Sequence, residues 1–134
     1  MKSYTDIEQS KKLAKFLPLK SADMWWLYIT AQGKRIAMMY EEPDPHYLAR
    51  MESYGIKDAA IRCWSLAALL DVLPKIYYPV RDHPTYFTLS KPKDKWYALY
   101  WDPTGMQDGE QTLADNPIDA CYEMILKLNE LNLL

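Results

Sequence analysis

A nearly apolar block lies at the centre of the chain, in the stretch CWSLAALLDVLPK. Ser65 is a favourable N-cap residue, and Pro74 ends the helix that Ser65 would start. Leucines recur at i, i+3, i+4 and i+7, a spacing typical of a helix face that points inward: Leu66, Leu69, Leu70 and Leu73. Because a helix of about two turns is not stable alone, we interpret this block as part of the core.

Capping residues predict three more helices. In the first, Thr5 stands three residues before Glu8, as in a capping box, and Pro18 ends the helix. A short helix is expected within residues 44–55, between an Asp–Pro pair and a glycine. The last helix begins at the Asn–Pro pair of residues 116–117. Two stretches with strand character lie between these helices.

Residues 24–41 have the composition of a β-hairpin. Aromatic and β-branched residues predict a strand from Met24 to Thr30, and Gly33 marks a turn. A second strand is expected from Arg35 to Glu41. A helix is the alternative for this segment, because its Met and Ala residues tolerate one.

A second hairpin joins residues 84–90 to residues 95–101 through the turn KPKDK. Successive side chains of a strand point to opposite faces. In the later strand, one face would hold Trp96, Ala98 and Tyr100, and the other Tyr97, Leu99 and Trp101. We expect the second set to point inward, because it is the larger apolar set.

These elements predict an α+β fold. The expected order is helix, hairpin, helix, helix, hairpin, helix, and residues 1–134 are expected to form a single globular domain. The simplest packing is one antiparallel sheet made of the two hairpins, with the helices mainly on one face.

The aromatic residues suggest a binding surface. The chain has 11 Tyr and 5 Trp against 2 Phe, and Tyr and Trp suit half-buried faces and interfaces. Alternation places another aromatic set on the face opposite to the one that the helices would cover, and the covered face is expected to hold Trp25, Leu27, Ile29, Phe87 and Leu89. The opposite, aromatic set is Trp26, Tyr28, Tyr86, Trp96 and Tyr100. We predict that it binds a protein partner or a second copy of the chain, unless a loop covers it.

The charges and reactive residues favour a non-catalytic protein. The net charge is −2, from 16 basic and 18 acidic residues, so nucleic acid is an unlikely partner. No catalytic motif is present, and no cofactor or metal is predicted. The soft metal ligands are not paired at a recognised spacing: His46, His83, Cys63 and Cys121. Both cysteines are expected to be free and buried.

Two alternatives to a binding module stay open. The 15-residue loop 102–116 carries acidic residues that a small or metal-dependent enzyme could use. An aromatic platform could also hold single-stranded nucleic acid. The longest apolar run, MWWLYI, is too short to cross a membrane, and a cytoplasmic location is the default expectation.

Three blocks of the sequence carry a resemblance. The blocks ADMWW, CWSLAALLDVLPK and DNPIDACYEMILKLNE occur in this order, and with them the chain resembles a family of short uncharacterised proteins of prophages and mobile elements of gut bacteria. The resemblance extends along nearly the whole chain and is weakest between Trp25 and Arg62. It implies a small cytoplasmic protein of a phage-like element, and it transfers no activity and no catalytic residue.

Overall fold

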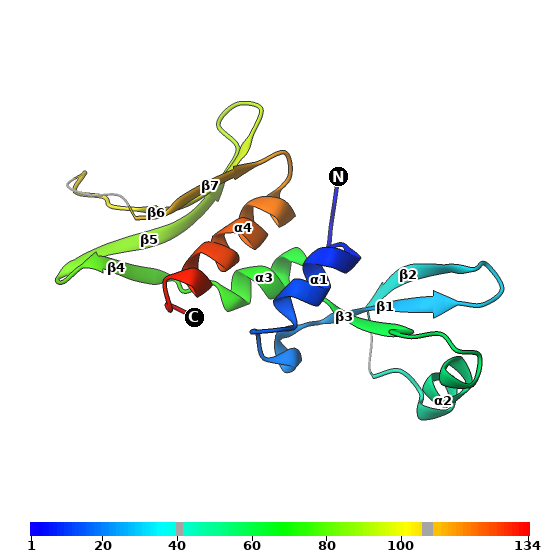
Figure 1. Ribbon diagram of the computed structural model, residues 1–134. Coiled ribbons are helices and arrows are strands. Elements are labelled where there is room, and N and C mark those ends of the chain that lie inside the picture. The colour runs from blue at the N-terminus through cyan, green and yellow to red at the C-terminus, as the bar shows by residue number, and fades with distance from the viewer. Residues whose placement is uncertain (40–41, 106–108) are drawn as a thin grey trace. The chain divides into compact units, whose positions relative to one another are not determined.

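A computed structural model describes residues 1–39, 42–105 and 109–134 (Figure 1). Helices and strands are mixed, so the α+β class is confirmed, as is the order of the predicted elements. The elements are α1 (Ile7–Leu13), η1 (Leu19–Ser21), β1 (Met24–Ile29), β2 (Lys34–Met39), α2 (Pro45–Ser53), β3 (Ala60–Cys63), α3 (Leu66–Val72), β4 (Ile76–Val80), β5 (His83–Ser90), β6 (Trp96–Trp101), β7 (Gln111–Ala114) and α4 (Pro117–Glu130).

The strands form two antiparallel sheets rather than one. The first sheet has the order β2-β1-β3 and the second β4-β5-β6-β7, so each predicted hairpin belongs to a sheet of its own. The chain divides into two compact units, Tyr4–Ala68 and Leu69–Leu134 with Met1–Ser3. The expectation of a single domain stays a prediction. Strands β3, β4 and β7 were not predicted from the sequence.

The hairpin prediction for residues 24–41 is confirmed, and its helical alternative is wrong. Strands β1 and β2 pair antiparallel, with Trp26 opposite Ala37, and Gly33 adopts a positive φ of 61° in the turn. Residues 40–41, the end of the predicted second strand, lie outside the described residues. On its other side β1 pairs with β3.

Helix α1 begins one residue later than predicted. Its capping box uses Asp6, whose side chain accepts from the Gln9 backbone N–H, in place of Thr5 and Glu8. Thr5 is fully buried instead, and its Oγ1 lies 2.8 Å from Ser10 Oγ. The same oxygen accepts from the Trp64 backbone N–H at 3.1 Å. Thr5 therefore ties the start of α1 to the segment after β3.

Helix α3 confirms the central block as core at two of its four leucines. Leu69 is fully buried and Leu73 is nearly so, whereas Leu70 is 38% exposed. The expectation that Leu70 points into the core is therefore wrong. The predicted cap is confirmed, since Ser65 Oγ accepts from the Ala68 backbone N–H at 3.2 Å.

Helix α4 lies along one face of the second sheet, over β6 and β7 (Figure 1). The predicted start of the helix is confirmed: Asn116 accepts from the Asp119 backbone N–H at 2.8 Å, and Pro117 follows it. The helix buries one side against the sheet and the interior of this unit. Its fully buried residues are Pro117, Ile118, Ala120, Cys121, Met124, Ile125 and Leu128.

The segment expected to be a loop over 102–116 contains strand β7. Gly109 makes the return to the sheet possible, because a Cβ there would lie 2.8 Å from Tyr100 Cβ. Its backbone N–H donates to the Tyr100 oxygen at 2.8 Å. Residues 106–108, including Asp108, lie outside the described residues.

Candidate functional site

Helix α4 lies on one face of the four-stranded sheet. No helix among the described residues of this unit covers the opposite face, which we call the outer face. Residues that pair directly across antiparallel strands share a face, which gives three rows of three side chains. None of the nine residues is charged. The rows are Ile76–Tyr86–Trp101, Thr88–Leu99–Gln111 and Ser90–Tyr97–Leu113.

Four large side chains of the outer face are strongly exposed: Ile76 at 44%, Tyr86 at 40%, Trp101 at 47% and Leu113 at 48%. Leu99 and Tyr97 are half-buried between them. Large contiguous apolar patches of this kind are uncommon on monomeric proteins and are often functional. The outer face is therefore the candidate binding surface of this unit.

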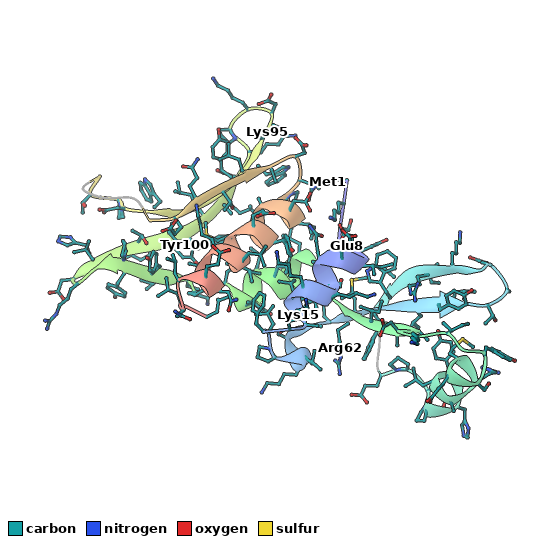
Figure 2. All side chains as sticks on the ribbon, in the orientation of Figure 1. Met1, Glu8, Lys15, Arg62, Lys95 and Tyr100 are labelled. Atoms are coloured by element: carbon teal, nitrogen blue, oxygen red, sulfur yellow. The ribbon has the colours of Figure 1, made fainter. Side chains whose placement is uncertain are left out.

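The opposite, inner face of the same sheet is core. Tyr100 is fully buried (Figure 2), with the rings of Tyr77 and Phe87 centred 5.6 and 5.5 Å away. Its hydroxyl donates to the Pro74 backbone oxygen at 2.7 Å. Burial raises the pKa of this phenol. Thr112 Oγ1 donates to the Ala120 oxygen at 2.7 Å and joins the inner face to α4.

The expected orientation of β6 is therefore wrong. Tyr100 points into the core and Trp101 points out, the reverse of the sequence-based expectation. Trp96 shares the inner parity and is half-buried. The reason is steric: Ala98 is fully buried between Trp96 and Tyr100, and a small residue there lets a helix approach the sheet. The prediction compared the total apolar size of the two sets of side chains and did not take the small Ala98 into account.

Trp26 and Tyr28 belong to the other sheet and do not continue the outer face. Trp26 Nε1 donates to the Thr5 oxygen at 3.0 Å, and its ring stands edge-on to Tyr4 at 5.5 Å. The Arg35 guanidinium lies 5.7 Å from the centre of the Tyr28 ring. Of the predicted helix-facing set, Phe87 and Leu89 lie on the inner face of the four-stranded sheet, opposite Tyr100 and Ala98. Trp25 belongs to the other sheet, and its ring lies under the Arg62 guanidinium at 4.2 Å.

Of the five predicted partner-binding residues, Tyr86 alone lies on the outer face. Residues that the sequence reasoning placed elsewhere or left out complete this face, chiefly Trp101, Ile76 and Leu113. Alternation was the right signal within each strand. Alternation does not show that the two hairpins belong to different sheets. Trp26, Tyr86 and Trp96 therefore do not share one aromatic face.

The two edge strands of this sheet are protected against pairing with a strand of another chain, whereas its outer face is exposed. Edge strand β4 contains Pro79, which has no N–H, and a register shift between Tyr77 and Val80. On the other edge, Lys127 Nζ donates to the Gln111 oxygen of β7 at 3.1 Å. Proline, irregular pairing and lysines are known devices against edge-to-edge association. The face, rather than an edge, is thus the surface open to a partner.

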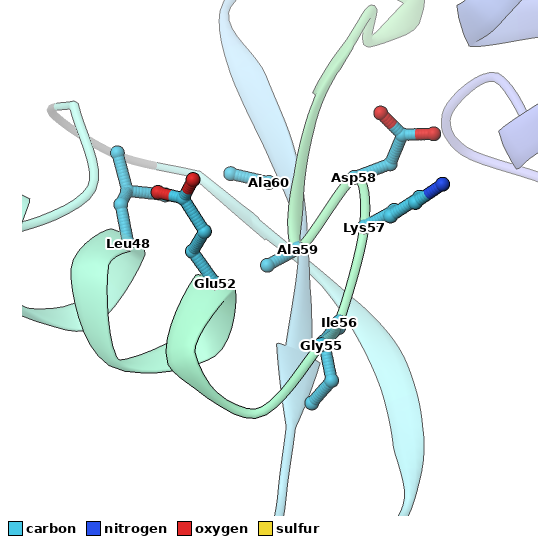
Figure 3. A pocket seen from close by; sticks show the side chains of 8 residues that line it. All are labelled: Leu48, Glu52, Gly55, Ile56, Lys57, Asp58, Ala59 and Ala60. Atoms are coloured by element: carbon cyan, nitrogen blue, oxygen red, sulfur yellow. The ribbon is translucent and has the colours of Figure 1, made fainter.

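The other unit has a shallow hollow of about 600 Å³ between α2 and β3 (Figure 3). Leu48 and Glu52 of α2 flank it on one side, and Ala59 and Ala60 flank it on the other, whereas Lys57 points outward. It is wide open to solvent. Such a space lacks the enclosure and the convergent polar groups of a small-molecule site.

The potential metal ligands do not cluster within the described residues. No cluster of three His, Cys, Asp or Glu side chains suited to a metal ion occurs there. The thiols of Cys63 and Cys121 are free and buried, as predicted. Burial raises both pKa values, that of Cys121 to about 12. A thiol with so high a pKa is a poor nucleophile at neutral pH.

The described acidic residues of segment 102–116 each have a partner within this unit. Asp102 accepts from Thr104 Oγ1 and from the Thr104 backbone N–H, at 2.6 and 2.8 Å. Asp115 pairs with Lys95, and Glu110 lies 3.4 Å from Lys127 Nζ. Asp108 lies outside the described residues. These partners account for the placement of the described carboxylates, so their placement is no evidence for a catalytic role.

Comparison of the chain with protein-family models, with curated proteins and with solved structures gives no match. The resemblance to prophage and mobile-element proteins stays a prediction. Among the described residues, every helix is too short or too polar to cross a bilayer.

Proposed function

We propose that this chain is a non-catalytic protein-binding module, an adaptor that acts through the outer face of its four-stranded sheet. The observation that carries the proposal is a row of large exposed side chains, Ile76, Tyr86 and Trp101, within a set of nine paired residues that carry no charge. Aromatic residues surrounded by apolar and uncharged polar groups are typical of interface centres. In keeping with the sequence resemblance, we propose that it works in the cytoplasm, encoded by a phage-like element.

The composition of the outer face favours protein over nucleic acid. A single-strand platform combines stacking aromatic rings with Lys or Arg residues that follow the phosphates. The outer face has the rings but none of its nine residues is basic. An enzyme that uses the acidic segment 102–116 is favoured less, because its described carboxylates already have partners.

Site-specific photo-cross-linking in the organism that encodes the chain tests this proposal. A benzoylphenylalanine would replace Trp101 in one variant and Tyr86 in another. The matched control replaces Tyr54, which is 63% exposed in the other unit. We expect positions 86 and 101 to give the same discrete, nuclease-resistant protein adduct, and position 54 to lack it.

Two results would contradict the proposal. Equal adducts from all three positions would mean that contact with the outer face is unspecific. Nuclease-sensitive adducts at positions 86 and 101 would mean that the face binds nucleic acid instead.

A further inference from the structure

We infer that the free edge of the three-stranded sheet binds an extended, acidic segment of a partner protein, which pairs with β2 as an additional strand. This site belongs to the other unit and goes beyond the function proposed for the outer face. Strand β1 lies between β2 and β3 (Figure 1), so β2 is an edge of its sheet. The backbone groups along such an edge are complementary to another extended backbone.

The backbone groups of β2 can be assigned to its two sides. In an antiparallel ladder, the N–H and C=O of one residue point to the same side, and the side alternates along the strand. The Tyr28 N–H donates to the Ala59 oxygen at 2.8 Å, so the Tyr28 backbone faces away from β2. Arg35 pairs with Tyr28 and must therefore direct its own N–H and C=O away from β1. By alternation Ala37 does the same, and within the described ranges no strand lies on that side of β2.

The other sheet edges have protection that β2 lacks. Strands β4 and β7 have the proline, the register shift and the lysine contact. Beyond β3, Tyr4 bridges Ser65, and the Thr5 N–H donates to the Trp64 oxygen at 2.9 Å. The six residues of β2 include no proline, and they pair with β1 without a register shift. Strand β2 is therefore the edge best suited to receive another strand.

The charge of β2 favours an acidic partner. Lys34 and Arg35 begin the strand, which contains no acidic residue. Lys34 is exposed and forms no ion pair with a described residue. The Arg35 guanidinium donates to the backbone oxygens of Lys57 and Asp58, at 3.1 and 3.3 Å. A lysine at an edge disfavours indiscriminate pairing, but it stabilises a neighbouring strand that places a carboxylate beside it.

NMR of the full chain, with a synthetic peptide as the probe, tests this inference. The peptide is Glu-Val-Thr-Val-Thr-Val-Glu with blocked ends, so that either direction of pairing brings a glutamate near Lys34. In the free chain, the amide protons of Arg35 and Ala37 should exchange with water faster than that of Ile36, which faces β1. With about 90% of the chain in complex, exchange at Arg35 and Ala37 should slow about tenfold, because the free fraction alone exchanges. Ile36 should change less.

Two matched controls isolate the backbone pairing and the charge. A peptide with the same side chains and N-methyl groups on alternate backbone nitrogens, on the side that would face β2, should not bind. Ala37→Pro removes an outward N–H and should bind the peptide at least about tenfold more weakly, while the β1–β2 pairing persists. Lys34→Glu should weaken binding by about twofold to tenfold and favour a peptide with lysines in place of the glutamates.

Four results would overturn the inference. The first is slow exchange at Arg35 and Ala37 in the free chain at every concentration, which would mean that the edge is already covered. The second is protection of these amides that grows with the concentration of the chain alone, which would mean that a second copy occupies the edge. The third is equal binding of the N-methylated peptide. The fourth is loss of the β1–β2 pairing in Ala37→Pro, which would mean that the Ala37 N–H faces β1.

Discussion

Leu69 and Leu70 are neighbours in α3 with opposite environments, fully buried and 38% exposed. Replacing a buried leucine by alanine removes its packing and leaves a cavity. Leu69→Ala should therefore lower the free energy of unfolding by about 2–5 kcal/mol, and Leu70→Ala by about 1 kcal/mol or less. Urea denaturation of both variants measures the difference. Equal losses would contradict the assigned orientation of α3.

The buried thiol of Cys121 makes stability sensitive to alkaline pH. Burial raises its pKa from 9.0 to about 12, and burial also raises the pKa of Tyr100. Above pH 9 the unfolded chain releases these protons while the folded chain retains them. The free energy of unfolding should therefore fall as the pH rises from about 9 towards 12.

Denaturation at a series of alkaline pH values measures this decrease. The Cys121→Ala variant removes one of the groups with a raised pKa, so its stability should decline less steeply than that of the parent. A parent and a variant that decline in parallel would show that the thiol titrates alike in both states.

Among the elements, α4 covers the inner face of the sheet, and its N-terminal cap stabilises this helix. Asn116 accepts from the Asp119 backbone N–H, and Lys2 Nζ lies 2.8 Å from the Asp119 carboxylate. Loss of an N-cap side chain costs about 0.5–2 kcal/mol. Asn116→Ala should lower the free energy of unfolding by this amount, whereas Asn116→Asp should largely preserve it. Thermal unfolding checks both variants, and a neutral Asn116→Ala would contradict the capping role.

The helices and the two hairpins were predictable because their signals are local. Asp44, Ser65 and Asn116 each cap the helix that follows, as the sequence indicated. Strands β3, β4 and β7 were missed for a physical reason. They are four or five residues long, and each is an edge strand. Such strands form because a longer strand beside them offers hydrogen-bond partners, which a local pattern does not reveal.

At the scale of the whole molecule, alternation predicted which residues share a face but not what covers it. The two alternating sets of β6 side chains were predicted correctly. The set that points inward is, however, the one with Ala98 rather than the one with Leu99. The assignment of hairpins to sheets was equally beyond local pattern, because it depends on long-range pairing. The candidate site was therefore predicted at Tyr86 and missed at Trp101.

Strand β6 separates a core face from the proposed binding face, and substitutions at its adjacent residues Tyr100 and Trp101 distinguish the two faces. Tyr100→Ser and Trp101→Ser remove large aromatic side chains from opposite sides of one strand. Trp101→Ser should change the melting temperature by about 2 °C or less. Tyr100→Ser should lower it by about 10 °C or more, because it empties a buried site. Equal losses, or a larger loss for Trp101→Ser, would contradict the assignment of Tyr100 to the core and Trp101 to the outer face.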